Sequence, residues 1–131
     1  WQGANEYGGV IAKFVKQARE GRPMTIFGDG TQQRDFMWIG DSVRAYLLSL
    51  ESQWPGPVNF GSGKPVSVNE IAMAINQKFD LPEPYQFLPP RPGDLRVLKA
   101  DITLACSLGW EPQVTFHDGI QRYMEWAVRR P

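Results

Sequence analysis

The sequence contains few of the residues from which disulfides and metal sites are built. Its 131 residues include one cysteine, Cys106, and one histidine, His117. A single cysteine cannot form a disulfide within the chain, which fits a reducing compartment, and we expect a cytoplasmic protein. Cys106 lies in a helical pattern and is expected to be a small buried hydrophobe, and His117 is expected on a solvated first helical turn. We predict no metal site.

The sequence also lacks an excess of charge of either sign and any long hydrophobic run. Lys and Arg together number 14, and so do Asp and Glu, which gives a formal net charge of zero. A nucleic-acid-binding surface needs a basic excess, and a membrane-surface patch needs a polybasic segment. No apolar run approaches the roughly 20 residues of a membrane span. We therefore predict neither a nucleic-acid partner nor a membrane partner.

Two common catalytic or cofactor-binding patterns are missing. No serine stands in the G-x-S-x-G sequence of a nucleophile elbow. The G-x-G-x-x-G turn of dinucleotide-binding strands is also not found, because Gly61-Ser-Gly63 continues as Lys-Pro-Val. The residues that are present favour anion binding over catalysis.

Hydrophobic periodicity and capping residues predict an α/β fold, a small mixed domain with few short strands and several helices. Helices are expected over residues 8–20, after Asp41 with Val43, Tyr46, Leu47 and Leu50 inward, after the capping pair Ser67 and Glu70, from Asp101 to Leu108, and after Thr115. Short strands are expected at Met24–Phe27, Asp35–Ile39, Val58–Phe60 and Tyr85–Leu88. Because this sheet is sparse for so many helices, we expect the chain to begin inside a longer gene product.

One stretch, Thr25 to Asp41, places a single cation between a glycine turn and an aromatic segment. Arg34 follows the turn at Gly28–Gly30, and far along the chain Arg91 precedes Asp94 in a proline-rich segment. Two arginines from distant loops can converge on a diphosphate, because guanidinium binds phosphate oxygens bidentately, and a carboxylate can bind a ribose diol. Taken one at a time, each arginine is better explained by an ordinary surface ion pair with a nearby aspartate.

Several motifs follow one another in an order that carries a family resemblance. The segments are Gly9–Phe14, Met24–Phe36 with the sequence Met-Thr-Ile-Phe-Gly-Asp-Gly-Thr-Gln-Gln-Arg-Asp-Phe, Val58–Gly63, Val66–Glu70, Arg91–Asp94, Lys99–Asp101, Leu108–Pro112 and Gly119–Trp126. Together they resemble the C-terminal part of the NAD-dependent epimerase/dehydratase family, the extended short-chain dehydrogenases that act on nucleotide sugars, such as UDP-glucose 4-epimerase. Each motif is weak alone, but their shared order is specific.

The resemblance implies substrate-binding roles for six side chains. These are Thr25 and Phe27 at the nucleotide base, Arg34 and Arg91 at the diphosphate, Asp94 at the ribose, and Leu98 at the C2 substituent of the sugar. The expected partner is therefore a nucleotide diphosphate sugar, with a bias toward a pyrimidine base. A leucine at position 98 is intermediate in bulk and decides little about N-acetylated sugars.

The catalytic motif of the family, Tyr-x-x-x-Lys, is not found in this chain. The residues four positions after Tyr7, Tyr46, Tyr85 and Tyr123 are Ile11, Leu50, Pro89 and Ala127. The resemblance therefore implies that NAD and the catalytic base belong to an N-terminal Rossmann half upstream of Trp1. Residues 1–131 would form the nucleotide-sugar-binding C-terminal domain, with no catalytic residue and no NAD bound by this chain alone.

The resemblance implies a longer enzyme that oxidises its sugar at C4 with NAD and then re-reduces it. A 4-epimerase acting on UDP-sugars is the first choice, and a 4,6-dehydratase, a decarboxylase or a reductase stays open. A reading of a different class is a non-catalytic module that binds nucleotide sugar or associates with itself, for example as a homodimer. An uncovered sheet edge and an apolar face would favour such association.

Overall fold

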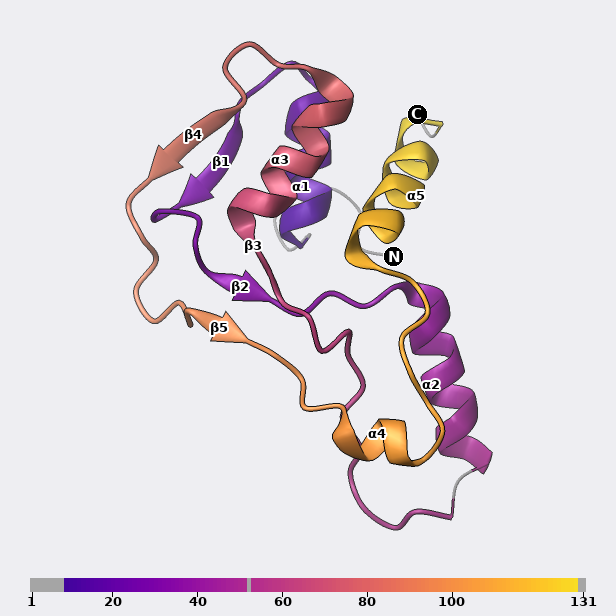
Figure 1. Cartoon of the computed structure of the whole chain (residues 1–131). Coiled ribbons are helices and arrows are strands. Elements are labelled where there is room, and N and C mark those ends of the chain that lie inside the picture. The colour runs from indigo at the N-terminus through magenta and orange to yellow at the C-terminus, as the bar shows by residue number, and fades with distance from the viewer. Residues whose placement is uncertain (1–8, 52, 130–131) are drawn as a thin grey trace.

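The computed structural model describes residues 9–51 and 53–129 of the chain (Figure 1). The helices are α1 (Val10–Arg19), α2 (Ile39–Glu51), α3 (Val68–Phe79), α4 (Thr103–Ser107) and α5 (Phe116–Val128). The strands are β1 (Met24–Phe27), β2 (Gln33–Arg34), β3 (Val66–Ser67), β4 (Tyr85–Leu88) and β5 (Val97–Leu98). The predicted fold class, a small α/β domain with short strands and several helices, is confirmed.

The strands form two small sheets that join segments far apart in the sequence. β1 and β4 pair in parallel along all four residues of each strand. In the second sheet β2 lies between β3 and β5, antiparallel to the first and parallel to the second. Arg34 in β2 is in register with Val66 on one side and with Leu98 on the other. β2 therefore brings the segment after the glycine turn beside residues more than sixty positions later.

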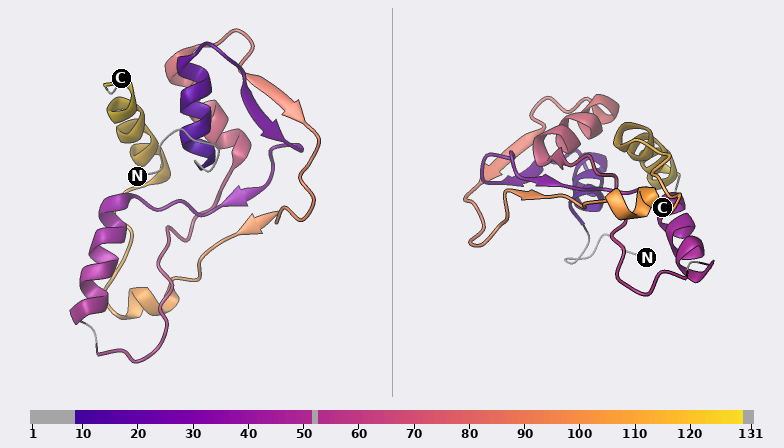
Figure 2. Two further views of the ribbon diagram at one scale, coloured as in Figure 1. Left: turned by 180° about the vertical axis from the view of Figure 1, so that it is seen from behind. Right: turned by 60° about the horizontal axis from the view of Figure 1, so that its bottom comes forward.

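In the main core, α1 and α3 pack against β1, and α5 packs against α1 and α3, as the views in Figure 2 show. Met24 and Ile26 of β1 are buried in this core, while Thr25 and Phe27 lie on the other face and stay partly exposed. This alternation is typical of a strand that is covered on one face. The α3 helix begins with the predicted capping box, in which Ser67 and Glu70 satisfy each other's backbone N–H groups.

A second, smaller cluster holds α2 and α4 together at the other end of the molecule, the lower end in Figure 1. Ala45 of α2, Ala105 of α4 and Trp110 are its buried members. The ring of Phe60 meets that of Trp110 nearly edge-on, with 5.0 Å between the ring centroids. The cluster is small because much of the apolar surface of α2 faces away from it.

Asp41 ties α2 to the segment that leads into α5. Its carboxylate accepts hydrogen bonds from the guanidinium of Arg44 at 2.6 Å and from the backbone N–H groups of Gln113 and Val114 at 3.2 and 3.1 Å. Burial alone would raise the pKa of Asp41, but these hydrogen bonds outweigh burial and the pKa lies below the ordinary value of 3.8. Asp41 was expected to cap α2, but the helix begins at Ile39, so this prediction is wrong.

Two predicted strands are also wrong. The strand expected at Asp35–Ile39 is displaced, because only Gln33 and Arg34 find pairing partners and the following residues run unpaired into α2. The strand expected at Val58–Phe60 has no neighbouring strand to pair with in the described part of the chain. Backbone pairing that depends on distant segments does not show in a local hydrophobic pattern.

The inward face predicted for α2 is wrong as well. Val43, Tyr46, Leu47 and Leu50 are exposed, with Leu50 at 83% of its full accessibility. The periodicity is real, but no element within residues 9–51 and 53–129 covers that side of the helix. Cys106, predicted to be buried, is exposed because α4 buries only Ala105.

Candidate functional site

The turn between β1 and β2 is built from two glycines and anchored on the start of α3. Gly28 and Gly30 have φ values of +71° and +74°, a conformation that glycine adopts without strain. Asn69 holds the turn, because its side chain donates to the carbonyl of Asp29 at 2.9 Å and its N–H donates to the carbonyl of Gly30 at 3.0 Å. Asp29 accepts hydrogen bonds from the hydroxyl and N–H of Thr31, which lower the pKa of its carboxyl.

Replacing Gly30 with alanine is expected to lower the free energy of unfolding by about 2 kcal/mol, because the left-handed backbone strains any other residue. A Cβ at position 30 would also lie 1.9 Å from Oδ1 of Asn69, so that side chain must leave the turn. Gly21→Ala is the matched control, since Gly21 has φ +68° and no atom within 4 Å of the added Cβ. Urea unfolding of the two variants should separate the cost of the contact with Asn69 from the cost of backbone strain. Equal losses in the free energy of unfolding would contradict the role given to Asn69.

The side chain of Arg34 connects β2 to the residues just before β5. Its Nη1 donates to the carbonyl of Leu95 at 2.7 Å, and its Nη2 forms an ion pair with the carboxylate of Asp94. The side chains of Arg34 and Asp94 are only 27% and 31% exposed. Leu98 follows on β5, in register with Arg34 and itself exposed. The structure thus brings together three residues that the resemblance had placed at the ribose, the diphosphate and the sugar.

Arg91 meets the ring of Phe27. Its guanidinium carbon lies 4.0 Å from the ring centroid, and Nζ of Lys13 lies 5.3 Å from the same centroid. Both distances are within the range of cation–π attraction. Lys13 was not predicted to belong to the site. It precedes Gln17 by four residues on α1, so the side chains of Lys13 and Gln17 lie on the same side of the helix, beside β1.

Thr25 lies apart from the arginines. Its hydroxyl accepts a hydrogen bond from Nε2 of Gln17 at 2.7 Å, and its N–H donates to Oε1 of the same side chain at 3.1 Å. Phe27 and Arg91 are connected to Arg34 and Asp94 through a short turn, in which the N–H of Asp94 donates to the carbonyl of Arg91 at 3.3 Å. Five of the six predicted side chains therefore lie along one continuous path, and Thr25 is oriented toward α1.

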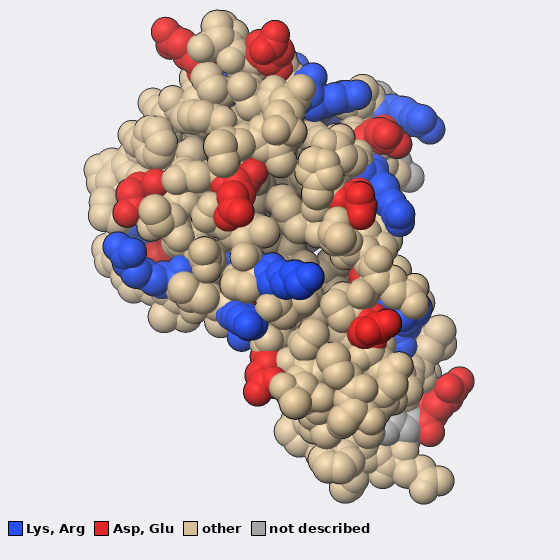
Figure 3. All heavy atoms as spheres, in the orientation of Figure 1, with Lys and Arg blue, Asp and Glu red and all other residues tan. Residues whose placement is uncertain are grey.

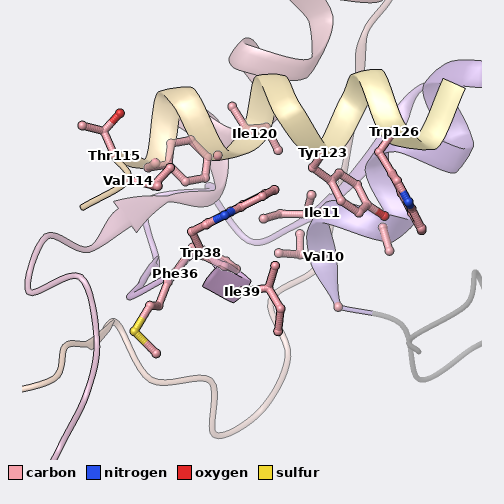
Figure 4. Close-up of a pocket in the computed structure, with 15 residues that line it drawn as sticks. Val10, Ile11, Phe36, Trp38, Ile39, Val114, Thr115, Ile120, Tyr123 and Trp126 are labelled. Carbon is pink, nitrogen blue, oxygen red and sulfur yellow. The ribbon is translucent and has the colours of Figure 1, made fainter. Parts of the chain in front are cut away.

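An apolar groove lies between α1, the segment 36–39 and α5, with a volume of about 790 Å³. Figure 4 shows side chains from all three elements pointing toward one another, among them Trp38, Ile39 and Tyr123. No charged side chain lines this groove. The groove is therefore unsuited to a diphosphate and is distinct from the arginine-bearing path.

Residues 9–51 and 53–129 contain no group of three or more His, Cys, Asp or Glu side chains that could hold a metal ion. In the same residues, no helix has both the length and the apolar character needed to cross a bilayer. The chemistry that this part of the chain offers is thus carried by arginines, one carboxylate and an aromatic ring.

The chain is similar in sequence to known enzymes that act on nucleotide sugars. The sequence model of the NAD dependent epimerase/dehydratase family matches residues 1–61. A UDP-glucose 4-epimerase of Mycolicibacterium smegmatis is 38% identical over 120 residues, which are 90% of this chain and 38% of that protein. UDP-glucuronic acid decarboxylase 4 of Arabidopsis thaliana is 34% identical over 114 residues, which are 86% of this chain and 26% of that protein.

Solved structures agree with the sequence comparisons. A UDP-glucose 4-epimerase of Thermotoga maritima, determined with UDP-glucose, superposes with a TM-score of 0.92 at 32% identity and covers 98% of this chain and 42% of its own. The Thermus thermophilus UDP-glucose 4-epimerase, in complex with NAD, gives a TM-score of 0.87 at 29% identity, covering 98% of this chain and 42% of its own. The fold is that of part of a Rossmann-type epimerase.

The resemblance that the motifs predicted is confirmed, because the model of the NAD dependent epimerase/dehydratase family matches residues 1–61 and the chain is similar to one part of its longer relatives. It spans between about a quarter and two fifths of the length of these curated relatives. Structures in this family bind UDP-sugars and NAD.

The turn that begins like a dinucleotide fingerprint does not fit the pyrophosphate of NAD. The turn most similar to a dinucleotide fingerprint is Gly61–Gly63, but the N–H groups of Ser62 and Gly63 already donate to the carboxylate of Asp35 at 2.7 and 3.0 Å. A negative charge in that position repels a pyrophosphate, and the donors that would cradle it are taken. Any NAD that acts with this chain must therefore be held by other residues.

Proposed function

We propose that residues 1–131 form the nucleotide-sugar-binding C-terminal domain of a longer, NAD-dependent 4-epimerase that acts on a UDP-sugar. The observation that carries the proposal is the arrangement around β2 and β5, where Arg34 pairs with Asp94 and Arg91 lies over Phe27. Cations, a ribose-binding carboxylate and an aromatic surface are the groups that a nucleoside diphosphate requires. Two of the similar proteins are named as a UDP-glucose 4-epimerase and a UDP-glucuronic acid decarboxylase.

In the proposed complex, each group on this path binds one part of the ligand. Phe27 and the β1 backbone near Thr25 lie at the base, and Arg34 and Arg91 bind the diphosphate oxygens. Asp94 then moves from Arg34 to the ribose hydroxyls, and Leu98 borders the sugar. The guanidinium groups suit this role because each can donate two parallel hydrogen bonds to phosphate oxygens.

The redox step belongs to the rest of the proposed enzyme. NAD, when bound there, removes a hydride from C4 of the sugar and returns it, so the epimerisation involves no net oxidation. This chain contributes binding and orientation by holding the nucleotide end while the sugar reacts elsewhere. Because one relative is named as a decarboxylase, the second choice for the reaction of the whole enzyme is decarboxylation, 4,6-dehydration or reduction.

The proposed location of the whole enzyme is the cytoplasm.

The exposed side of α2 provides a surface for the remainder of that enzyme. Val43, Tyr46, Leu47 and Leu50 are joined by Ile39, which is 67% exposed and also lines the apolar groove. In Figure 3 the lower part of the molecule, over α2 and α4, carries few charged side chains, while charges of both signs are scattered above it. A group of exposed apolar side chains of this kind marks an interaction site. We assign it to the N-terminal Rossmann half.

The same surface favours a second candidate function, a module that associates with itself as a homodimer. Leu47 and Leu50 are more than half exposed on one side of α2 and would be buried against a second copy. In that case nucleotide binding would be weak or missing. The two candidates differ in their response to UDP.

Titration calorimetry of the chain with UDP tests the proposed function. We expect heat of binding with UDP and an affinity for UMP that is weaker by about tenfold, because UMP lacks the second phosphate for the arginine pair. Circular dichroism confirms that the chain is folded in each run. A folded chain that releases no heat with UDP would contradict the proposal, and a dimer in sedimentation under the same conditions would favour the second candidate.

A further inference from the structure

Asp35, the residue after Arg34, has a carboxylate that is fully engaged with two distant segments. One oxygen accepts from the N–H of Ser62 at 2.7 Å and from its hydroxyl. The other accepts from the N–H of Gly63 at 3.0 Å and from the N–H of Ala100 at 3.1 Å. All four donors come from residues 27 to 65 positions away in the sequence.

The side chain of Asp35 continues the sheet beyond its last backbone pair. β2 ends at Arg34, yet the carboxylate of the next residue still binds the segment before β3 and the residue shortly after β5. The approach is close, because a Cβ at Gly61 would lie 2.6 Å from the Cβ of Ala100 and 2.9 Å from a carboxylate oxygen of Asp35. Only glycine at position 61 allows the three segments to meet.

Arg34 and Asp35 together hold both ends of β5. The guanidinium of Arg34 binds the carbonyl of Leu95 before the strand, and the carboxylate of Asp35 binds the N–H of Ala100 after it. Leu98 lies between these two attachments and is otherwise exposed. Its position therefore depends on these two side chains and on the pairing of β5 with β2, rather than on packing around it.

We propose that Asp35 is a positioning residue that fixes Leu98, and with it the sugar end of the nucleotide-sugar site. The proposal deepens the proposed function and rests on it for the role of Leu98. The attachment of β5 by Asp35 stands on the contacts alone.

Asp35→Asn tests the attachment with almost no change in shape. However the amide is rotated, its NH₂ group faces N–H donors where the carboxylate accepted them, so one side of the network must open. We expect amide hydrogen exchange across residues 97–100 to become faster by about tenfold or more, while exchange in α3 stays within about twofold. Gly61→Ala should have the same local effect by pushing the loop away from Ala100. Asp118→Asn removes an equal charge from α5 and should leave residues 97–100 unchanged.

Ligand binding supplies the readout that a merely structural role would not change. In Asp35→Asn, the affinity for UDP-glucose should fall by about tenfold relative to the wild-type chain, and the affinity for UDP by no more than about threefold. Unchanged exchange at residues 97–100, an equal rise in α3, or equal losses for both ligands would overturn the proposal. If the wild-type chain binds no UDP, the proposed function fails, and the exchange result still decides whether Asp35 holds β5.

Discussion

Replacing Asp41 with alanine is expected to lower the free energy of unfolding by about 3 to 4 kcal/mol, the largest loss predicted for this chain. Asp41 is 2% exposed, and its carboxylate is the acceptor for two backbone N–H groups and for Arg44. Alanine would leave those N–H groups, at Gln113 and Val114, without their partner in a partly buried region. Urea denaturation at neutral pH measures the loss as a lower midpoint at unchanged slope.

Asp41→Asn is the matched control, since it keeps the shape and one acceptor oxygen and should cost about half as much. The lowered pKa also predicts a pH dependence. The unfolded state binds a proton near the ordinary value of 3.8 and the folded state binds it at lower pH, so the stabilisation is present above that value. It is lost as the pH falls through the folded pKa. A loss below about 1 kcal/mol in the alanine variant would contradict this role.

Arg34→Gln is expected to weaken binding of UDP by about 10- to 100-fold, the scale of one or two charge-assisted hydrogen bonds. The substitution removes the cation proposed to bind the diphosphate. It also leaves Asp94 without its partner, so an unpaired carboxylate then faces an incoming anion. Both effects act against binding, which is why the loss should exceed that of a surface arginine. Calorimetry with UDP provides the dissociation constants.

Two further variants sharpen this experiment. Arg34→Lys keeps the charge without the bidentate geometry and should lie between the wild type and the glutamine variant. Arg22→Gln removes an arginine from another ion pair, with exposed Glu20, and should leave UDP affinity unchanged. An Arg34→Gln variant that binds UDP as tightly as the wild type would remove Arg34 from the proposed site.

The sequence was informative wherever an element is completed by neighbours within the chain. α1, α3 and α5 each carry an apolar face at helical spacing, and each face is buried in the main core. The capping residues Ser67 and Thr115 act locally, through bonds that reach no more than three residues ahead, so they too could be predicted. β1 and β4 were predicted because Met-Thr-Ile-Phe and Tyr-Gln-Phe-Leu are rich in apolar and aromatic residues, which favour short strands.

Elements that depend on distant or external partners could not be predicted in this way. β2, β3 and β5 have two residues each and exist only because they pair with one another. The periodicity of α2 predicted an apolar face correctly, but it could not show that no other element in the described part of the chain covers that face. The same limit explains Cys106, since α4 is too short for its periodicity to define a face.

The sequence predicted only part of the candidate site, because the contacts within the site also join residues that are far apart in the chain. The family resemblance brought Arg34, Arg91 and Asp94 to attention although they are far apart in the sequence. It did not reveal that Arg34 and Asp94 pair directly across 60 residues, nor that Asp35 binds residues up to 65 positions away. An acidic residue after an arginine gives no local sign of its partners, because three of the four donors to Asp35 are backbone N–H groups.

The pairing of Arg34 with Asp94 has a consequence for which anions the proposed site accepts. A small inorganic anion that binds Arg34 must break the ion pair and leaves the carboxylate with nothing to bind. A nucleoside diphosphate breaks the same pair but presents a ribose diol to the released carboxylate. Both Arg34 and Asp94 then bind the ligand in place of each other. We therefore expect Asp94 to discriminate against free phosphate and sulfate by competing with them for Arg34, and to favour ligands in which phosphate and ribose are covalently joined.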